Sequence, residues 1–267
     1  MKYILSLFVL ALSLNASIYY AKVEPYEKYS IKAAASGEVM SVFKEAEGRV
    51  SKGGVLIRID DALNKKDLES SNKKLKSLKR TMELTVKNLK NSKEVERIRE
   101  NSYKRIKNLK TKSKASKDAE LINLINASNQ VLSLENSLEN LKVSISDLEF
   151  KIASLEDVIK KKSIKIKQGY LIYKIYVNKG DFVNVGMPVV DGYDISKGKL
   201  TIYLSSEDVQ KAKQSKIYIN DKLSNLSIDK IWKVVDTQNI SSYKAEIIMP
   251  APKRFSELLK IELRDKQ

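Results

Sequence analysis

The feature that most constrains this 267-residue chain is a long stretch with neither glycine nor proline. No residue between Asp61 and Lys167 is of either type, and all nine glycines of the chain lie outside this stretch. Glycine and proline are the residues that interrupt helices most strongly. The stretch therefore predicts α-helix over residues 62–167, with strand-rich segments on both sides.

Apolar residues recur every seven positions in the second part of this stretch. One row is Leu124, Val131, Leu138, Ile145, Ile152, Ile159 and Ile166, and a second row is Ala127, Leu134, Leu141, Leu148 and Leu155. Steps of three and four residues place both rows on one face of a helix. This pattern predicts the seam of a left-handed coiled coil.

The first part of the stretch shows a similar but less regular repeat. Leu68, Leu75, Met82 and Leu89 are seven residues apart, with Leu78 between them, and Val95, Ile98, Ile106 and Leu109 follow after an expected break in phase. A short polar segment, residues 111–117, separates the two parts. Two helices of matched length joined by a short loop predict an antiparallel helical hairpin with its tip near residues 110–117.

The two segments that flank the helices resemble each other. Gly37 and Gly48 recur 132 residues later as Gly169 and Gly180, and Val50, Gly53 and Leu56 recur 133 residues later as Val183, Gly186 and Val189. Two copies in the same order predict one small β-domain assembled from residues 30–61 and 168–196. Alternating segments after it predict a third strand-rich region over residues 197–267.

Composition excludes several kinds of chemistry. The chain has no cysteine and no histidine, which removes disulfides, the common zinc sites and Cys- or Ser-His nucleophilic catalysis. We therefore expect no enzyme activity, no catalytic residue, no cofactor and no metal.

The net charge predicts the kind of partner, and the N-terminal residues predict the compartment. The chain carries 50 lysines and arginines against 33 aspartates and glutamates, a net charge of +17, which favours an anionic partner. Lys2 precedes an apolar run, residues 3–14, that is too short to span a bilayer, and small residues follow at Ala16 and Ser17. This layout predicts a signal peptide over residues 1–17, cleaved near Ala16 or kept as an anchor. Export makes nucleic acid an unexpected partner.

Three residues near the expected hairpin tip are candidates for binding. Arg105 and Leu109 are four residues apart before the bend, and Ser116 follows seven residues later. Simpler roles are also open at this point. Ser116 suits a helix N-cap with Asp118 and Glu120 in the first turn, and Leu109 suits the last position of the seam.

The order of half-motif, helical hairpin, half-motif and strand-rich region resembles the periplasmic adaptors, or membrane fusion proteins, of the HlyD and efflux-pump adaptor family. The half-motifs themselves resemble those of a lipoyl domain, but the helical hairpin replaces the lysine-bearing tip, so lipoylation is not implied. The resemblance implies an elongated α+β fold: a long antiparallel α-helical coiled-coil hairpin inserted in a split lipoyl-like β-domain, followed by a small β-barrel. The family's membrane-proximal domain is expected to be absent or reduced to fragments near residues 20–29.

The resemblance also implies a function and partners. Arg105, Leu109 and Ser116 match the residue types and spacing with which the family's hairpin tip binds a TolC-type outer-membrane channel. The implied protein is a periplasmic, homo-oligomeric adaptor, such as a hexamer. It would link that channel to an inner-membrane transporter, with the resistance-nodulation-division type favoured over the ABC type.

Two other functions are open. An exported coiled-coil structural or chaperone-like protein would explain the heptads but not the duplicated half-motif. A carbohydrate- or lipid-binding β-domain is less favoured, because no aromatic cluster in the sequence marks a pocket.

Overall fold

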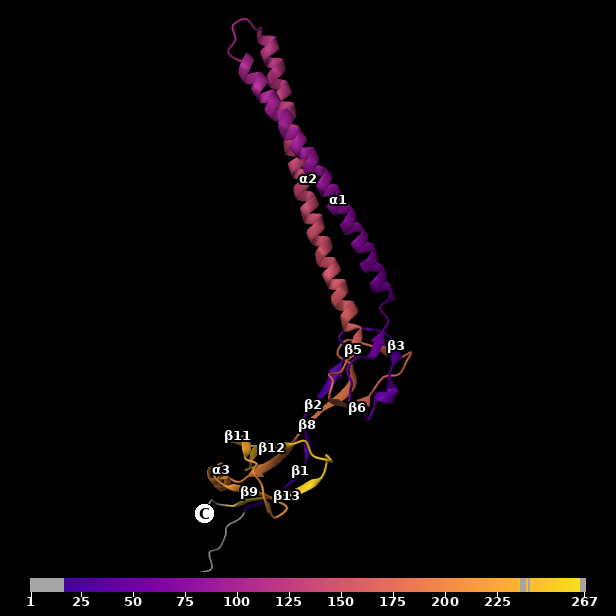
Figure 1. The fold of residues 1–267 in the computed structure, drawn as a ribbon, viewed down its shortest axis with the longest axis vertical. Coiled ribbons are helices and arrows are strands. Elements are labelled where there is room, and N and C mark those ends of the chain that lie inside the picture. The colour runs from indigo at the N-terminus through magenta and orange to yellow at the C-terminus, as the bar shows by residue number, and fades with distance from the viewer. Residues whose placement is uncertain (1–16, 236–238, 240, 265–267) are drawn as a thin grey trace, which may run out of the picture. The chain divides into compact units, whose positions relative to one another are not determined.

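The computed structural model describes residues 17–235, 239 and 241–264 and divides the chain into two units. One unit is formed by residues 59–163, and the other by residues on both sides of that segment. The expected signal peptide lies outside the described residues except for Ser17, which begins the first strand. The strands and helices, drawn in Figure 1, are β1 (Ser17–Lys22), β2 (Glu24–Lys32), β3 (Gly37–Val42), η1 (Lys44–Ala46), β4 (Val55–Ile59), α1 (Ala62–Ile106), α2 (Lys114–Lys161), β5 (Ser163–Lys165), β6 (Tyr170–Ile175), β7 (Phe182–Val183), β8 (Pro188–Leu204), α3 (Ser206–Ala212), β9 (Lys216–Ile219), β10 (Lys222–Leu223), β11 (Ile228–Val235), β12 (Tyr243–Pro250) and β13 (Leu258–Arg264).

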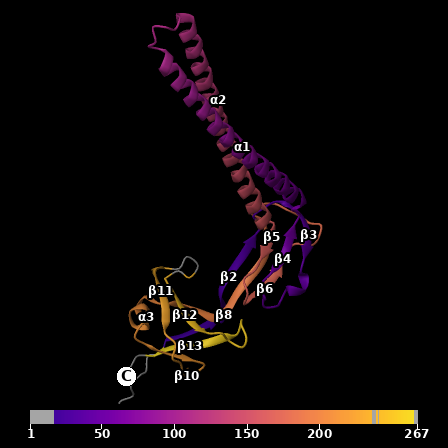
Figure 2. The ribbon, with the colours of Figure 1, turned by 45° about the horizontal axis from the view of Figure 1, so that its top comes forward.

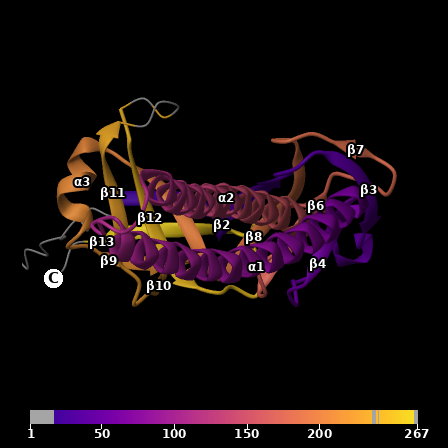
Figure 3. The same ribbon diagram turned by 90° about the horizontal axis from the view of Figure 1, so that it is seen from above.

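The helical unit consists of α1 and α2, which lie side by side in Figures 1 and 3. Ion pairs between the two helices join ascending positions on α1 to descending positions on α2, so the helices run antiparallel. The pairs and their N–O distances are Lys79–Glu149 at 2.7 Å, Lys93–Glu135 at 2.7 Å and Arg99–Glu120 at 3.7 Å. Exposed ion pairs contribute only about 0–1 kcal/mol each, so the apolar seam supplies most of the stability of the pair.

The seam of α2 follows the predicted heptads, with Val131, Ile145 and Ile152 buried. On α1 the expected break in phase after Leu89 is wrong. The row continues at seven-residue steps through Glu96 and Tyr103, which are both half-buried. Val95 and Ile98, which suggested the break, lie off the seam and are 50% and 51% exposed. The apolar pattern misled here because polar side chains occupy part of the seam.

The predicted end of the helical segment at residue 167 is also wrong. Helix α2 ends at Lys161, and β5 follows directly. Ile164 and Ile166 are buried at two-residue spacing, which is the period of a strand, although Ile166 also fitted the heptad row. No glycine or proline marks this boundary, and the lysines of the last turn, Lys160 and Lys161, are a weaker signal of a helix end.

Strands from both flanks of the helices form one sheet, in the order β5-β4-β3-β7. Figure 2 shows β3, β4, β5 and β6 close together in the β unit. Two glycine turns join the halves reciprocally. The N–H of Gly180 donates to the carbonyl of Val39 at 2.9 Å, and the N–H of Gly48 donates to the carbonyl of Ile172 at 2.8 Å. Both glycines have positive φ, 91° and 76°, which other residues adopt only with strain.

The other two sheets of the β unit correct the expected domain boundaries. Strand β8 pairs with β2 and β6 along its first part and with β12 along its second part, so the expected boundary between residues 196 and 197 falls inside one strand. Strand β1 pairs with β13. Residues 20–29 were expected as fragments of a separate domain, but all of them except Val23 lie in strands of these two sheets. Their partners are distant in sequence, so local patterns did not reveal the pairing.

Strands β1, β8, β9, β12 and β13 enclose one apolar core, which we call the C-terminal core. Its buried members are Ala21, Val23, Leu200, Ile202, Leu204, Ala212, Ile217, Ala245, Ile247, Leu259, Ile261 and Leu263. Ala21 on β1 and Val23 after it belong to this core, so a strand from before the long helices completes a core that is otherwise formed by strands after them.

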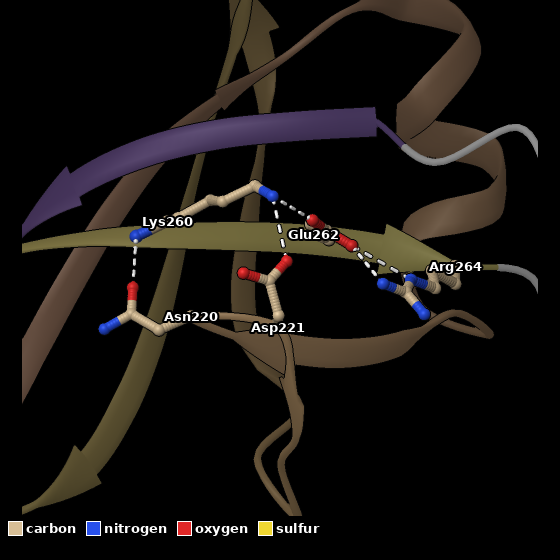
Figure 4. Close-up of polar contacts among 5 residues, drawn as sticks. All are labelled: Asn220, Asp221, Lys260, Glu262 and Arg264. Carbon is tan, nitrogen blue, oxygen red and sulfur yellow. Dashed lines mark hydrogen bonds and ion pairs between the residues drawn. The ribbon is translucent and has the colours of Figure 1, made fainter.

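A buried carboxylate lies beside this core on β13 (Figure 4). The side chain of Glu262 is only 5% exposed and lies between Lys260 and Arg264, whose Nη2 is 2.6 Å from its Oε2. Lys260 also pairs with Asp221. Hydrogen bonds from Lys260 and Arg264 lower the pKa of Glu262 to about 2. The carboxylate is therefore stabilised in its charged form.

This lowered pKa predicts acid-dependent stability. The unfolded chain binds a proton at Glu262 near its ordinary pKa of about 4.3, whereas the folded chain does so only near pH 2. The stability advantage of the native chain over Glu262→Gln is expected to be full at pH 6 and to disappear as the pH falls from about 4.5 to 2. Urea unfolding followed by the fluorescence of Trp232, the chain's one tryptophan, measures it. An advantage that stays constant over this range would contradict the assignment, and Glu257→Gln serves as the exposed control.

Candidate functional site at the connection between the long helices

The connection between α1 and α2 spans residues 107–113. Ser113, whose backbone is extended, caps α2 by accepting a hydrogen bond from the N–H of Ser116 at 3.2 Å. The suggested N-cap role of Ser116 is therefore wrong, because the capping serine lies one turn earlier. The helix begins at Lys114, so the connection begins three residues before the expected range of 110–117 and ends within that range.

The structure places Arg105, Leu109 and Ser116 around this connection, all exposed. Arg105 lies in the last turn of α1, and its Nη2 donates to the hydroxyl of Ser102 at 3.3 Å. Leu109 lies beyond the helix in a turn, where its N–H donates to the carbonyl of Ile106, so it does not share a helical face with Arg105. Ser116 lies in the first turn of α2. Within the part of the chain that the structure describes, none of these three side chains pairs with a carboxylate.

A cationic segment surrounds these residues. Residues 101–117 contain seven lysines and arginines and no acidic residue. The first turn of α2 also lacks acidic residues, and Lys114 and Lys117 lie at the positive end of the helix dipole. Each such lysine costs about 0.3–1 kcal/mol at a helix N-terminus, where a carboxylate would be favourable. A site that departs from local stability rules in this way is typical of a functional surface, here one suited to an acidic partner.

An uncharged stripe on α1 leads to Arg105. At alternating steps of four and three residues it contains Ser77, Thr81, Leu84, Asn88, Asn91, Val95, Ile98 and Ser102. The rest of α1 is highly charged, with fourteen basic and six acidic residues in the whole helix. Leu84, Val95 and Ile98 are about half exposed. A stripe without charge on so charged a helix is typical of a second packing face. Sequence reasoning missed it, although the absence of charge at this spacing was a usable signal.

Among residues 17–235, 239 and 241–264, no group of three acidic side chains could hold a metal ion. Within the same ranges, no helix has the length and apolar character needed to cross a membrane.

No protein-family model matches the chain, and no curated protein matches its sequence. Solved structures do match. MacA from Actinobacillus actinomycetemcomitans has a TM-score of 0.60 and 18% identity, with 94% of this chain and 78% of MacA covered. The membrane fusion protein Spr0693 from Streptococcus pneumoniae R6 has a TM-score of 0.67 and 10% identity, with 94% of this chain and all of Spr0693 covered.

A third matching structure is a chimeric protein whose helical domain comes from a second protein. It is a MacA–MexA chimera that contains the Pseudomonas aeruginosa MexA α-hairpin domain, with a TM-score of 0.58, 16% identity and coverage of 95% of this chain and 83% of the chimera. Identities this low establish similarity of fold. The chain therefore has the fold of a membrane fusion protein, as its half-motifs and heptads predicted.

Proposed function

We propose that this protein is a non-enzymatic periplasmic adaptor of a tripartite efflux pump or secretion system. The hairpin formed by α1 and α2 would dock on a TolC-type outer-membrane channel through Arg105, Leu109 and Ser116. The β unit, with its lipoyl-like module and C-terminal core, would lie towards an inner-membrane transporter. The transporter would hold the adaptor at the inner membrane, with the resistance-nodulation-division type favoured over the ABC type.

One observation carries this proposal: the helix connection, at the end of two long antiparallel helices, is exposed and cationic, and its lysines form no ion pair with any carboxylate that the structure describes. Such a surface suits an acidic, helical partner, because charge complementarity steers docking and excludes wrong partners. The binding energy would shift the channel between closed and open states, so no bond-making step is required.

Several copies would act together. The uncharged stripe on α1 offers a packing face for a neighbouring copy, and α2 has an excess of acidic over basic residues that complements the basic α1. A ring of hairpins, such as a hexamer, would form a conduit with the cationic connections at its end.

Site-specific cross-linking in cells tests the proposal. Because the chain has no cysteine, Leu109→Cys introduces a single thiol at the connection. A thiol-directed photo-cross-linker at this position is expected to capture an outer-membrane channel, with a yield that falls as salt is raised. Asn72→Cys, an exposed position near the start of α1, is the matched control. Equal capture from both positions, or no channel captured at Leu109→Cys, would contradict the proposal.

A further inference from the structure

A cleft of about 330 Å³ opens on the β unit, and none of its lining residues belongs to the helix connection. Residues that lie far apart in the sequence line it: Lys22, Glu24 and Lys28 near β2, Tyr173 on β6, Tyr193 on β8 and Phe255 before β13. The sequence had shown no aromatic cluster, because these rings come from three separate segments. The proposed docking function does not use this cleft.

Two tyrosines form a platform in the cleft. The rings of Tyr173 and Tyr193 are stacked, with centroids 4.5 Å apart and planes at 21°. Tyr193 pairs across the sheet with Leu171 on one side and Lys28 on the other, so these three residues share a face. Tyr173 occupies an irregularity between Ile172 and Lys174, where β6 has one residue more than β8. Such a bulge redirects a side chain, and Tyr173 is left 53% exposed on the same side as Tyr193.

Charged groups surround the platform with an excess of positive charge. Lys28 Nζ is 2.6 Å from Glu24 Oε1, so these two side chains neutralise each other. Lys22 is exposed and has no ion pair within the described ranges. The cleft therefore offers one exposed aromatic face, one polar pair and one free ammonium group.

We infer that this cleft binds an acidic sugar, a single pyranose ring that carries a carboxylate or phosphate. The exposed face of Tyr173 would pack against the C–H face of the ring, with Tyr193 holding Tyr173 in place. Glu24 and Lys28 would exchange hydrogen bonds with ring hydroxyls, and Lys22 would pair with the anionic group. The volume is near the lower end of the range for ligand pockets, about 300–1,000 Å³, and suits one ring. Three charged side chains in so small a cleft disfavour a large apolar ligand. This inference does not rest on the proposed function.

Ligand-observed NMR titration of the full chain with glucuronate tests the inference, with glucose and benzoate as matched probes. Glucuronate is expected to bind in the millimolar range and more tightly than glucose. Tyr173→Ala is expected to weaken glucuronate binding about five- to tenfold, whereas Tyr173→Phe keeps it. Lys22→Gln is expected to lower glucuronate affinity to that of glucose and to leave glucose binding unchanged.

Tyr20→Ala is the matched control, since Tyr20 is 66% exposed on β1 and does not line the cleft. Three results would overturn the inference: no saturable binding of glucuronate, equal binding of glucuronate to Tyr173→Ala and the native chain, or tighter binding of benzoate than of glucuronate. The last result would assign the cleft to planar aromatic acids instead. Thermal unfolding of each variant checks that the β unit is intact.

Discussion

Replacing Arg105 by aspartate, or Ser116 by arginine, is expected to abolish pump-dependent drug resistance while folding and export continue. Arg105 is exposed and contacts only the Ser102 hydroxyl among its described hydrogen bonds, so the fold does not depend on it. An aspartate there reverses the charge within a segment of seven basic residues, and a mismatched charge in an interface costs several kcal/mol. Arginine at position 116 places a long cationic side chain where a small hydroxyl stood.

Resistance of cells that carry each variant, compared with the level of the exported protein, measures this effect. Lys90→Asp is the matched control, because Lys90 is an exposed basic residue of α1 away from the connection. This control is expected to keep resistance. Unchanged resistance in both Arg105→Asp and Ser116→Arg would count against the docking site.

Replacing Ile57 by alanine is expected to destabilise the β unit by about 2–5 kcal/mol. Ile57 is completely buried on β4, in the sheet that also contains β5 and β7 from the other side of the helices. Because these strands share one sheet, the amides of β5 and β7 are expected to lose protection together with those of β3 and β4. Hydrogen exchange measured by mass spectrometry shows this directly.

Val50→Ala is the matched control for Ile57→Ala. Val50 belongs to the same flank but is 49% exposed, so its truncation is expected to change the free energy of unfolding by less than about 0.5 kcal/mol. Faster exchange confined to β3 and β4 in Ile57→Ala would show that the two flanks fold independently.

The prediction from sequence was strongest where the pattern was local. The heptads of α2 placed Val131, Ile145 and Ile152 in the seam, where the structure buries them. The pattern failed on α1 because burial there includes Glu96 and Tyr103, which hydrophobicity alone does not select. At the connection, the spacing located the three candidate residues, but the position of the cap decided that Ser113 begins the helix and Ser116 follows it.

By itself the sequence determined the two long helices and placed glycines at positions that adopt positive φ, because helix periodicity and the conformational freedom of glycine are local properties. The tertiary structure alone decided that β1 pairs with β13 and β2 with β8. It also decided that a bulge in β6 brings the ring of Tyr173 against that of Tyr193. Strand pairing joins residues that are far apart in the chain, and its register depends on packing across the whole sheet. No local pattern carries that information.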